Sequence, residues 1–338
     1  MATLLITGAA GFVGHHLALR LAGEGHRVVG VDDLNRLFFP TLKEERARRI
    51  AGTPGCTFRR MDVADPAAVD ALFREFAFDG VVHFAAQTGV RFSKDLPFEY
   101  ERSNIQGTLA VFDAAARHGR PRVVYASSSS VYGDSPDVPW REDQAADQPV
   151  SLYAATKRAD ELMARAYLAT HGLSTVGLRF FTVYGPFGRP DMAVWTFAEA
   201  IASGEPVPLY DGGRMKRDFT FVDDAVEVTR ALLQMPDLEG ARVFNVGPGD
   251  PQDLDTLLRH LEEALGRPAR RQVLPAQAGD VPATWADPTA LRKAIGFHPR
   301  TPLREGVQAF VDWYRAHPDL VAQVRRERAA SGQPGGAR

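Results

Sequence analysis

The segment that most constrains the fold is a short apolar run followed at once by three evenly spaced glycines. Leu4-Leu-Ile6 precedes Gly8-Ala-Ala-Gly11-Phe-Val-Gly14, and helix-forming sequence continues to about residue 24. This order predicts a strand, a tight turn and a helix. The first glycine permits the turn, the second lets the backbone approach a pyrophosphate, and the third lets the helix pack closely on the sheet. The turn, with its intervening Phe12 and Val13, is a candidate dinucleotide cradle, although its spacing differs from Gly-x-Gly-x-x-Gly.

Carboxylates follow the next two predicted strands. Asp32 ends the second strand, 18 residues after Gly14. A carboxylate there accepts hydrogen bonds from the adenosine ribose and repels a 2′-phosphate, which favours NAD over NADP. Asp33 and Asn35 are candidates to share that work. Asp62-Val63 follows the third strand, where the aspartate either meets the adenine amino group or caps a helix.

Strands and helices then alternate along the first half of the chain. Apolar runs at 4–6, 27–31, 58–61, 81–84, 123–126 and 175–179 are separated by amphipathic segments such as 67–76 and 104–117. This alternation predicts an α/β fold, a Rossmann-like doubly wound parallel sheet. We expect an NAD-binding domain over 1–180 with returning segments near 223–248, a smaller interleaved C-terminal substrate lobe over 181–316, and a disordered tail over 325–338.

Composition narrows the class of protein. The 338 residues are 45% hydrophobic and 24% charged with a net charge of −2, so nothing points to nucleic acid or a membrane surface. The single cysteine, Cys56, excludes an internal disulfide and suits a reducing compartment. The first strand leaves no room for a signal peptide, so a cytoplasmic location is expected. No residues have metal-ligand spacing, and no metal is expected.

Tyr153 and Lys157 lie four residues apart in Ser151-Leu-Tyr-Ala-Ala-Thr-Lys157, at the start of a predicted helix. That spacing places both side chains on one helix face. An ammonium close to a phenol favours the phenolate, which can take the proton of an alcohol as hydride leaves its carbon. With the glycine turn, the pair predicts NAD-dependent redox chemistry at a carbinol carbon.

A run of serines, Ser127 to Ser130, follows the strand at 123–126. Open α/β sheets bind ligands at the carboxyl ends of their strands. These hydroxyls can therefore bond a sugar hydroxyl or a developing ketone. A polar turn with no further role is the alternative interpretation.

Taken together, these motifs resemble the extended short-chain dehydrogenases/reductases of the NAD-dependent epimerase/dehydratase family, and within them most closely the UDP-glucuronate 4-epimerases. The resemblance extends to about residue 314. It is carried by Ala85-Ala-Gln-Thr-Gly-Val-Arg-Phe-Ser93, Ser127-Ser-Ser-Ser-Val-Tyr-Gly133, Pro149-Val-Ser-Leu-Tyr-Ala-Ala-Thr-Lys157, Leu178-Arg-Phe-Phe-Thr-Val-Tyr-Gly-Pro-Phe-Gly-Arg-Pro-Asp-Met192 and Arg217-Asp-Phe-Thr-Phe-Val-Asp-Asp224.

The resemblance implies a role for each matching residue. Tyr153 is the general base and acid, Lys157 assists it and holds the nicotinamide ribose, and Ser128 bonds the sugar O4. The cofactor-binding set implied is Gly8, Gly11, Phe12, Val13, Gly14, Asp32, Asp33, Asn35, Asp62, Val63, Ala85, Ala86, Gln87, Asn104, Tyr153 and Lys157. The substrate-binding set implied is Gln87, Arg91, Ser128, Ser129, Ser130, Thr182, Arg189, Arg217, Gln277 and Asp280.

The implied reaction is reversible C4 epimerisation of UDP-glucuronate to UDP-galacturonate through a transient 4-keto sugar, with NAD tightly bound. Alternatives are a UDP-glucose/UDP-galactose 4-epimerase, a UDP-glucuronate decarboxylase or a non-catalytic NAD-binding protein. By resemblance, decarboxylases carry a Glu at the position of Ser130, and 4,6-dehydratases an Asp-Glu pair at Ser129-Ser130. A homodimer is implied, with the helices at 104–117 and 152–170 paired in a four-helix bundle.

Overall fold

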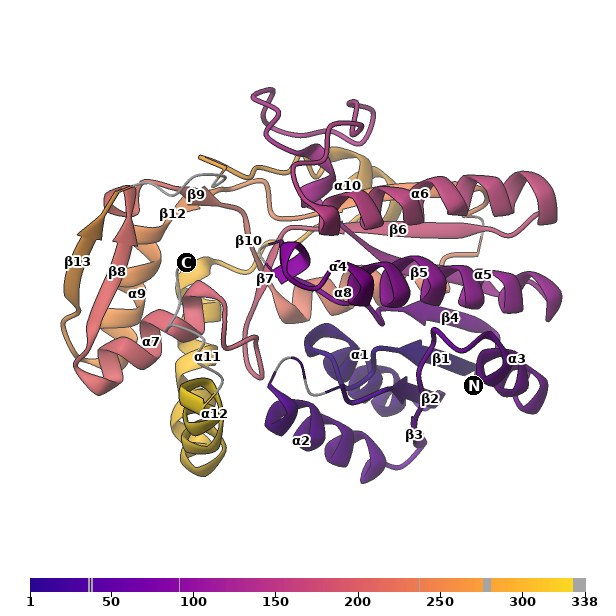
Figure 1. Cartoon of the computed structure of the whole chain (residues 1–338), viewed down its shortest axis with the longest axis horizontal. Coiled ribbons are helices and arrows are strands. Elements are labelled where there is room, and N and C mark those ends of the chain that lie inside the picture. The colour runs from indigo at the N-terminus through magenta and orange to yellow at the C-terminus, as the bar shows by residue number, and fades with distance from the viewer. Residues whose placement is uncertain (36, 38, 91, 237, 276–280, 331–338) are drawn as a thin grey trace.

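The computed structural model describes residues 1–35, 37, 39–90, 92–236, 238–275 and 281–330. Its centre is a seven-stranded parallel sheet in the order β11-β6-β5-β4-β1-β2-β3 (Figure 1). The expected parallel α/β sheet is confirmed. Its strands are β1 (Thr3–Thr7), β2 (Arg27–Asp32), β3 (Cys56–Arg60), β4 (Gly80–His83), β5 (Arg122–Ser128), β6 (Thr175–Phe180) and β11 (Ala241–Val246).

Both faces of this sheet are covered by helices, because successive side chains of a strand point to opposite faces. In β5, Val124 packs in one apolar cluster, whereas Val123 and Tyr125 pack in the other. One face carries α1 (Phe12–Gly23) and α8 (Val222–Gln234). The other carries α3 (Pro66–Glu75), α5 (Gly107–Arg117) and α6 (Leu152–His171). Helix α2 (Pro40–Ala51) and the short α4 (Pro97–Tyr100) complete this half.

The strand order reverses beside β1. The chain runs outward from β1 to β2 and β3, and then returns to the other side of β1 as β4. Loops leaving β1 and β4 therefore diverge at their carboxyl ends, and such a switch point opens a crevice for a ligand. The glycine turn leaves β1 at this crevice. The serine run and helix α6 follow β5, the next strand along.

A smaller unit is built mainly from residues after Phe180 (Figure 1). Its ladders are β7 (Thr182–Tyr184) with β10 (Phe219–Phe221), β8 (Pro206–Tyr210) with β13 (Arg270–Leu274), and β9 (Lys216–Arg217) with β12 (Gln252–Asp253). Its helices are α7 (Ala193–Ser203), α9 (Leu254–Leu265) and α11 (Leu303–Ala316), whereas α10 (Thr289–Ile295) packs on β11 and α8 of the large sheet. Meanwhile α8 and β11 return to the large sheet, and one apolar cluster runs through both parts of the fold.

Residues 325–330 form a helix, contrary to the expectation of a disordered tail over 325–338. They belong to α12 (Pro318–Ala330), and residues 331–338 lie outside the described ranges. Arg325 and Arg328 both pair with Glu199 of α7, while Glu327 accepts a hydrogen bond from the backbone N–H of Thr41 in α2 at 3.3 Å. Because these partners lie far away in sequence, composition alone does not reveal them.

A buried ion pair fixes the serine run against helix α6. The Arg179 guanidinium on β6 makes two 2.8 Å hydrogen bonds to the Glu161 carboxylate, which also accepts one from Ser127 Oγ at 2.7 Å. Arg179 further donates to the Tyr132 hydroxyl at 2.8 Å. Breaking such a buried pair typically costs about 3–5 kcal/mol, so the network determines where the serine run sits.

In the described part of the chain, no helix is both long and apolar enough to cross a bilayer. The same residues hold no cluster of three or more His, Cys, Asp or Glu side chains arranged to bind a metal ion.

Candidate active site

The glycine turn after β1 leaves no room for side chains. Gly8 has a φ of +68°, and a Cβ added there would lie 2.5 Å from the backbone N of Ala85. A Cβ on Gly11 or Gly14 would lie 2.8 or 2.3 Å from the Gly8 carbonyl oxygen. The turn therefore packs directly on the chain leaving β4, and no side chain caps the first N–H groups of helix α1. This is the close backbone approach that a dinucleotide pyrophosphate requires.

Asp32 ends β2 beside this turn. Its carboxylate accepts hydrogen bonds from the backbone N–H groups of Ala10 at 3.1 Å and Leu34 at 2.9 Å. Burial raises the pKa of this carboxyl, while the Lys43 ammonium and the two hydrogen bonds oppose that shift. Two oxygens held rigidly at the end of β2 suit the two hydroxyls of a ribose.

The side chains of Asp33 and Asn35 are hydrogen-bonded to each other. The Asn35 side chain donates to the Asp33 carboxylate at 3.0 Å, and Lys43 Nζ donates to Asn35 Oδ1 at 2.8 Å. Lys43 is thus a basic neighbour of the expected ribose site that sequence reasoning missed.

Arg46 lies on the same helix, α2, and is only 5% exposed. Its guanidinium donates to the carbonyl oxygens of Ala10 at 3.2 Å and Phe187 at 2.5 Å. It therefore joins the glycine turn to the loop after β7. The helical spacing of Arg46 with Leu42 and Ile50, which are also buried, was the available signal.

Asp62 does not cap the next helix. That cap is Asp65, whose carboxylate accepts from the N–H groups of Ala67 and Ala68. Asp62 instead accepts from Ala64 N at 2.8 Å and pairs with Arg102 at 2.5 Å. The adenine alternative for Asp62, and the cofactor role of Val63, which is buried beside Gly107, stay predictions.

Asn104 is fully buried and fastens the chain leaving β4 to helix α6. Its side chain accepts from Gln87 N at 2.8 Å, donates to Gln87 O at 3.1 Å and donates to Thr156 Oγ1 at 2.9 Å. It lies in a π-helical turn, Glu101–Gln106, so the helix expected from residue 104 becomes regular only at Gly107. Asn104 thereby fixes Ala85, Ala86 and Gln87 along the edge of the crevice.

Tyr153 and Lys157 stand on the first two turns of α6, as the sequence predicts. Lys157 is buried, and its Nζ donates to Asp160 Oδ2 at 2.9 Å. The ring of Tyr153 lies edge-on to that of Tyr100, with centroids 6.2 Å apart. Tyr100 is itself anchored through hydrogen bonds to the carbonyl oxygens of Thr88 at 2.7 Å and Gly89 at 2.8 Å. A phenol and a buried ammonium thus share one end of the crevice.

The serine run divides into a structural and an accessible part. Ser127 is tied to Glu161, as described above. Ser128 Oγ accepts from both Ser130 N at 3.2 Å and Ser130 Oγ at 2.9 Å, at the start of the 3₁₀ turn Ser129–Tyr132. Ser129 and Ser130 are partly exposed, so their hydroxyls remain available at the carboxyl end of β5.

Two further expected side chains come from the smaller unit. Thr182 is partly exposed in β7, where its N–H donates to Asp218 O at 3.0 Å. Arg189 donates to Thr88 Oγ1 at 2.8 Å and pairs with Asp191 at 2.5 Å. Thr88 therefore links Arg189 to the β4 side of the crevice.

Arg217 and three other expected residues are placed less fully. Arg217 in β9 donates to Val281 O at 2.9 Å. Arg91, Gln277 and Asp280 lie outside the described residues, and their substrate roles stay predictions.

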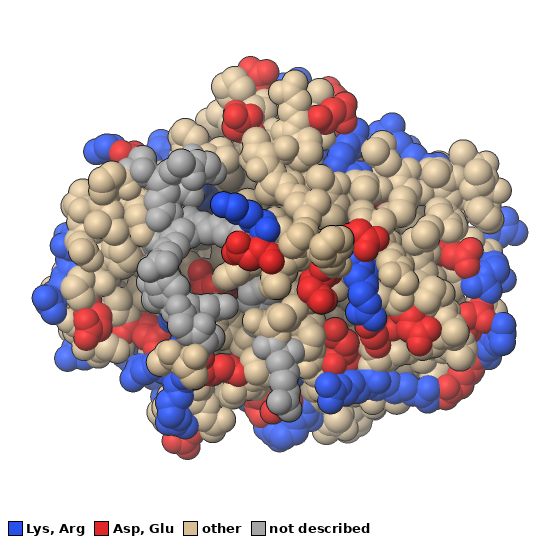
Figure 2. Space-filling view, viewed as in Figure 1, with Lys and Arg blue, Asp and Glu red and all other residues tan. Residues whose placement is uncertain are grey.

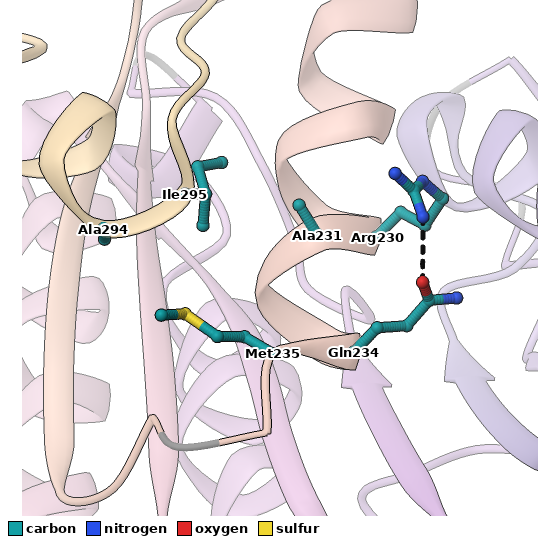
Figure 3. A pocket seen from close by; sticks show the side chains of 6 residues that line it. All are labelled: Arg230, Ala231, Gln234, Met235, Ala294 and Ile295. Atoms are coloured by element: carbon teal, nitrogen blue, oxygen red, sulfur yellow. Dashed lines mark hydrogen bonds between the residues drawn. The ribbon is translucent and has the colours of Figure 1, made fainter.

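The surface is hollowed between the β8–β13 unit and the large sheet in Figure 2, with acidic and basic side chains beside the hollow. Two other cavities lie elsewhere. One of about 320 Å³ is lined by Arg230, Gln234, Met235 and Ile295, among others (Figure 3). Met235 O accepts from Arg122, the first residue of β5, so this cavity is at the opposite, amino edge of the sheet. The other, of about 510 Å³, is lined by residues of α2 and of the start of α12.

Comparison with known proteins decides the family. The model of the NAD dependent epimerase/dehydratase family matches residues 4–247. The chain belongs to this family. A probable UDP-glucuronate 4-epimerase of Rhizobium meliloti is 41% identical over 335 residues, covering 93% of this chain and 98% of the relative.

Solved structures agree with that placement. UDP-glucuronic acid 4-epimerase from Bacillus cereus, in complex with UDP-glucuronic acid and NAD, has a TM-score of 0.86 at 30% identity and covers 93% of this chain and 99% of its own. UDP-glucose 4-epimerase from Thermotoga maritima, with UDP-glucose, has a TM-score of 0.85 at 27% identity and covers 94% and 100%. The cofactor of this epimerase/dehydratase is NAD, and the bare glycine turn and Asp32 fit it.

Replacing Gly14 should remove the cofactor. We expect Gly14→Ala to push α1 off the glycine turn, because the new Cβ would meet the Gly8 carbonyl at 2.3 Å, and to lower NAD content at least ten-fold. Gly23→Ala, at the end of the same helix with no atom within 4 Å, is the matched control and should retain NAD. Absorbance of a heat extract measures both. Equal NAD content in the two variants would contradict the assignment of the turn.

Proposed function

We propose that the protein interconverts UDP-glucuronate and UDP-galacturonate by inverting C4 through a 4-keto intermediate. The observation that carries this proposal is the convergence of Tyr153, Lys157 and Ser128 on the crevice that the glycine turn and Asp32 line. A relative named as a probable UDP-glucuronate 4-epimerase and a solved neighbour in complex with UDP-glucuronic acid support the choice of substrate. We expect residues 1–180 and 223–248 to bind NAD, and residues 181–316 to make most of the contacts with the sugar nucleotide.

The glycine turn and Asp32 would hold NAD, which would supply hydride acceptance and return at C4 of the sugar. The protein supplies the proton chemistry. In the proposed cycle, the Tyr153 phenolate removes the O4 proton while Ser128 Oγ donates a hydrogen bond to O4. The Lys157 ammonium stabilises the phenolate and holds the ribose beside it. Tyr153 returns the proton once the 4-keto sugar has rotated.

Holding the carboxylate is the second requirement. A 4-keto uronic acid is a β-keto acid and loses CO₂ when its carboxyl bond aligns with the carbonyl π system. Partly exposed hydroxyls at Ser129, Ser130 and Thr182 can bond the carboxylate away from that alignment. Because these hydroxyls bring neither the Glu of the decarboxylases nor the Asp-Glu pair of the dehydratases, the site favours epimerisation over both.

The remaining polar residues are proposed to anchor the nucleotide while the sugar turns. Arg189 reaches across the crevice from the loop after β7, and Arg217 lies on β9. A guanidinium fits a phosphate bidentately, which fixes orientation better than an ammonium does. Gln87 is proposed to contact the sugar from the β4 side, and Arg91, Gln277 and Asp280 to contact the substrate. The expected compartment is the cytoplasm.

Substrate choice is tested by supplying UDP-glucuronate, UDP-galacturonate, UDP-glucose and UDP-galactose separately. We expect C4 inversion of the acidic pair, and loss of at least 10²-fold in kcat for Tyr153→Phe, because the phenylalanine cannot transfer the O4 proton. Product separation by chromatography measures both. Equal turnover of the neutral and acidic pairs would contradict the proposed binding of the sugar carboxylate. Full activity of Tyr153→Phe would contradict the proposed role of Tyr153 in proton transfer.

The carboxylate role of Thr182 is tested by Thr182→Val, which keeps the shape and removes the hydroxyl. We expect epimerisation to slow roughly ten-fold, from loss of a hydrogen bond to a charged group, and a UDP-pentose to appear through decarboxylation. Thr170→Val, at an exposed position near the end of α6, is the matched control. A Thr182→Val enzyme that releases no pentose would count against this role.

A homodimer is also proposed, with α5 and α6 of two copies packed together. Leu109 on α5 is 42% exposed and Leu162 on α6 is 52% exposed, so each helix presents an apolar side chain away from the sheet. Val111 and Phe112 of the same helix are fully buried in the sheet core. Two adjacent helices from each copy suffice for a four-helix bundle.

The double variant Leu109→Glu with Leu162→Glu should be monomeric, since four carboxylates would have to be buried in the bundle. Light scattering after gel filtration measures the mass. Val273→Glu, at a side chain that is 69% exposed on β13, is the control and should keep the wild-type mass. A wild-type protein that elutes as a monomer would contradict the dimer.

A further inference from the structure

The proposed mechanism leaves one buried acid beside the active site unused. Asp160 is fully buried on α6 and stands one turn after Lys157 and two turns after Tyr153. The spacing of three and seven residues places all three side chains on one face of the helix. Lys157 Nζ donates to Asp160 Oδ2 at 2.9 Å, with both side chains at most 3% exposed.

The other carboxylate oxygen is not satisfied in the same way. Asp160 Oδ1 is buried and has no hydrogen-bond partner of ordinary geometry among the described residues. Thr108 of α5 lies close enough to favour the ionised form, and the Thr108 hydroxyl also meets His83 Nε2 at 3.1 Å. His83 Nδ1 in turn meets Thr7 Oγ1 at 2.7 Å. A line of buried polar groups therefore runs from Lys157 across the sheet to β1.

The charged and titratable groups around Asp160 come from four elements. Lys157 and Glu161 share its helix, and His83 faces it through Thr108 from β4. Tyr125 faces it from β5, and Glu161 is neutralised by Arg179 of β6. Burial keeps the pKa of His83 at about 3, so this histidine is neutral. Lys157 is thus the cation directly bonded to Asp160.

We propose that Asp160 is a positioning residue that anchors the Lys157 ammonium and offsets part of its charge at Tyr153. The phenolate of Tyr153 then feels an ion pair rather than a lone cation, so removing the Asp160 charge should favour the phenolate. One Nζ donor is committed to Asp160, and two remain for the ribose and the phenol side. This inference rests on the proposed function of Tyr153 and Lys157.

The size of the effect follows from distance. Residues seven apart on a helix are separated by about 10 Å along its axis. Two unit charges at that separation, at an effective dielectric constant near 20, shift a titration by about one pH unit. Burial raises the pKa of Asp160 to about 6, so its negative charge is present at neutral pH and is lost as the pH falls through that value.

The variant Asp160→Asn removes the charge and keeps an oxygen acceptor for Lys157. We expect the acid limb of its pH–kcat profile to move about one unit lower than in the wild type, with KM for the UDP-sugar and NAD content unchanged. Asp312→Asn, at an exposed position on α11 bonded only to Gln308 in the described structure, should leave the profile in place.

A second readout is independent of the substrate. Phenolate absorbance in the near ultraviolet, taken as the difference between an enzyme and its Tyr153→Phe partner, follows ionisation of this phenol directly. The midpoint should be lower in Asp160→Asn than in the wild type. If no sugar is turned over but the midpoint still moves, the proposed function fails while this inference stands.

The result that overturns the inference is an acid limb and a phenolate midpoint that stay unchanged or rise in Asp160→Asn. Loss of NAD with an unchanged midpoint would likewise overturn it, since Asp160 would then only support the fold. Should Asp160→Asn not fold, Thr108→Val replaces it. That variant removes the hydroxyl favouring the ionised carboxylate, so the acid limb should move in the same direction by a smaller amount.

Discussion

The buried face of helix α6 is the constraint on which the rest of the site depends. Its inner side carries Lys157, Asp160 and Glu161, three charged groups that could not enter a sheet core alone. Each is compensated, Lys157 by Asp160 and Glu161 by Arg179. Because unpaired charges in a low-dielectric core are costly, the bonds to Glu161 from Arg179 on β6 and from Ser127 on β5 fix the register of α6 on these strands. The position of Tyr153 on the first turn follows from that register.

The crevice itself is a product of strand order and of missing side chains. Reversal of the strand order beside β1 separates the loops after β1 and β4. Because Gly8 has no Cβ, the loop after β1 can pack directly against the backbone at Ala85, in the loop after β4. A polar clamp from Asn104 holds the same chain from the other side. The groups that meet a nucleotide are therefore held mainly by backbone contacts.

Much of the fold and the core of the site followed from local spacing in the sequence. The strand-glycine-helix order, the carboxylate ending β2 and the Tyr153–Lys157 pair each depend on residues close together in the chain. The contacts of Arg46 and Thr88 could not be found in that way. Arg46 bonds a loop about 140 residues away, as the Phe187 contact shows. The π-helical turn around Asn104 likewise arises from its contacts with Gln87 and Thr156, which periodicity does not encode.

Helix α12 has a consequence for how the molecule is assembled. It fastens α2, which packs on β3 of the large sheet, to α7 of the smaller unit. Both of those helices lie earlier in the chain. During synthesis this fastening can therefore form only after both helices have been made. The shared apolar cluster and the bond from Arg46 to Phe187 O can join the two parts before it does.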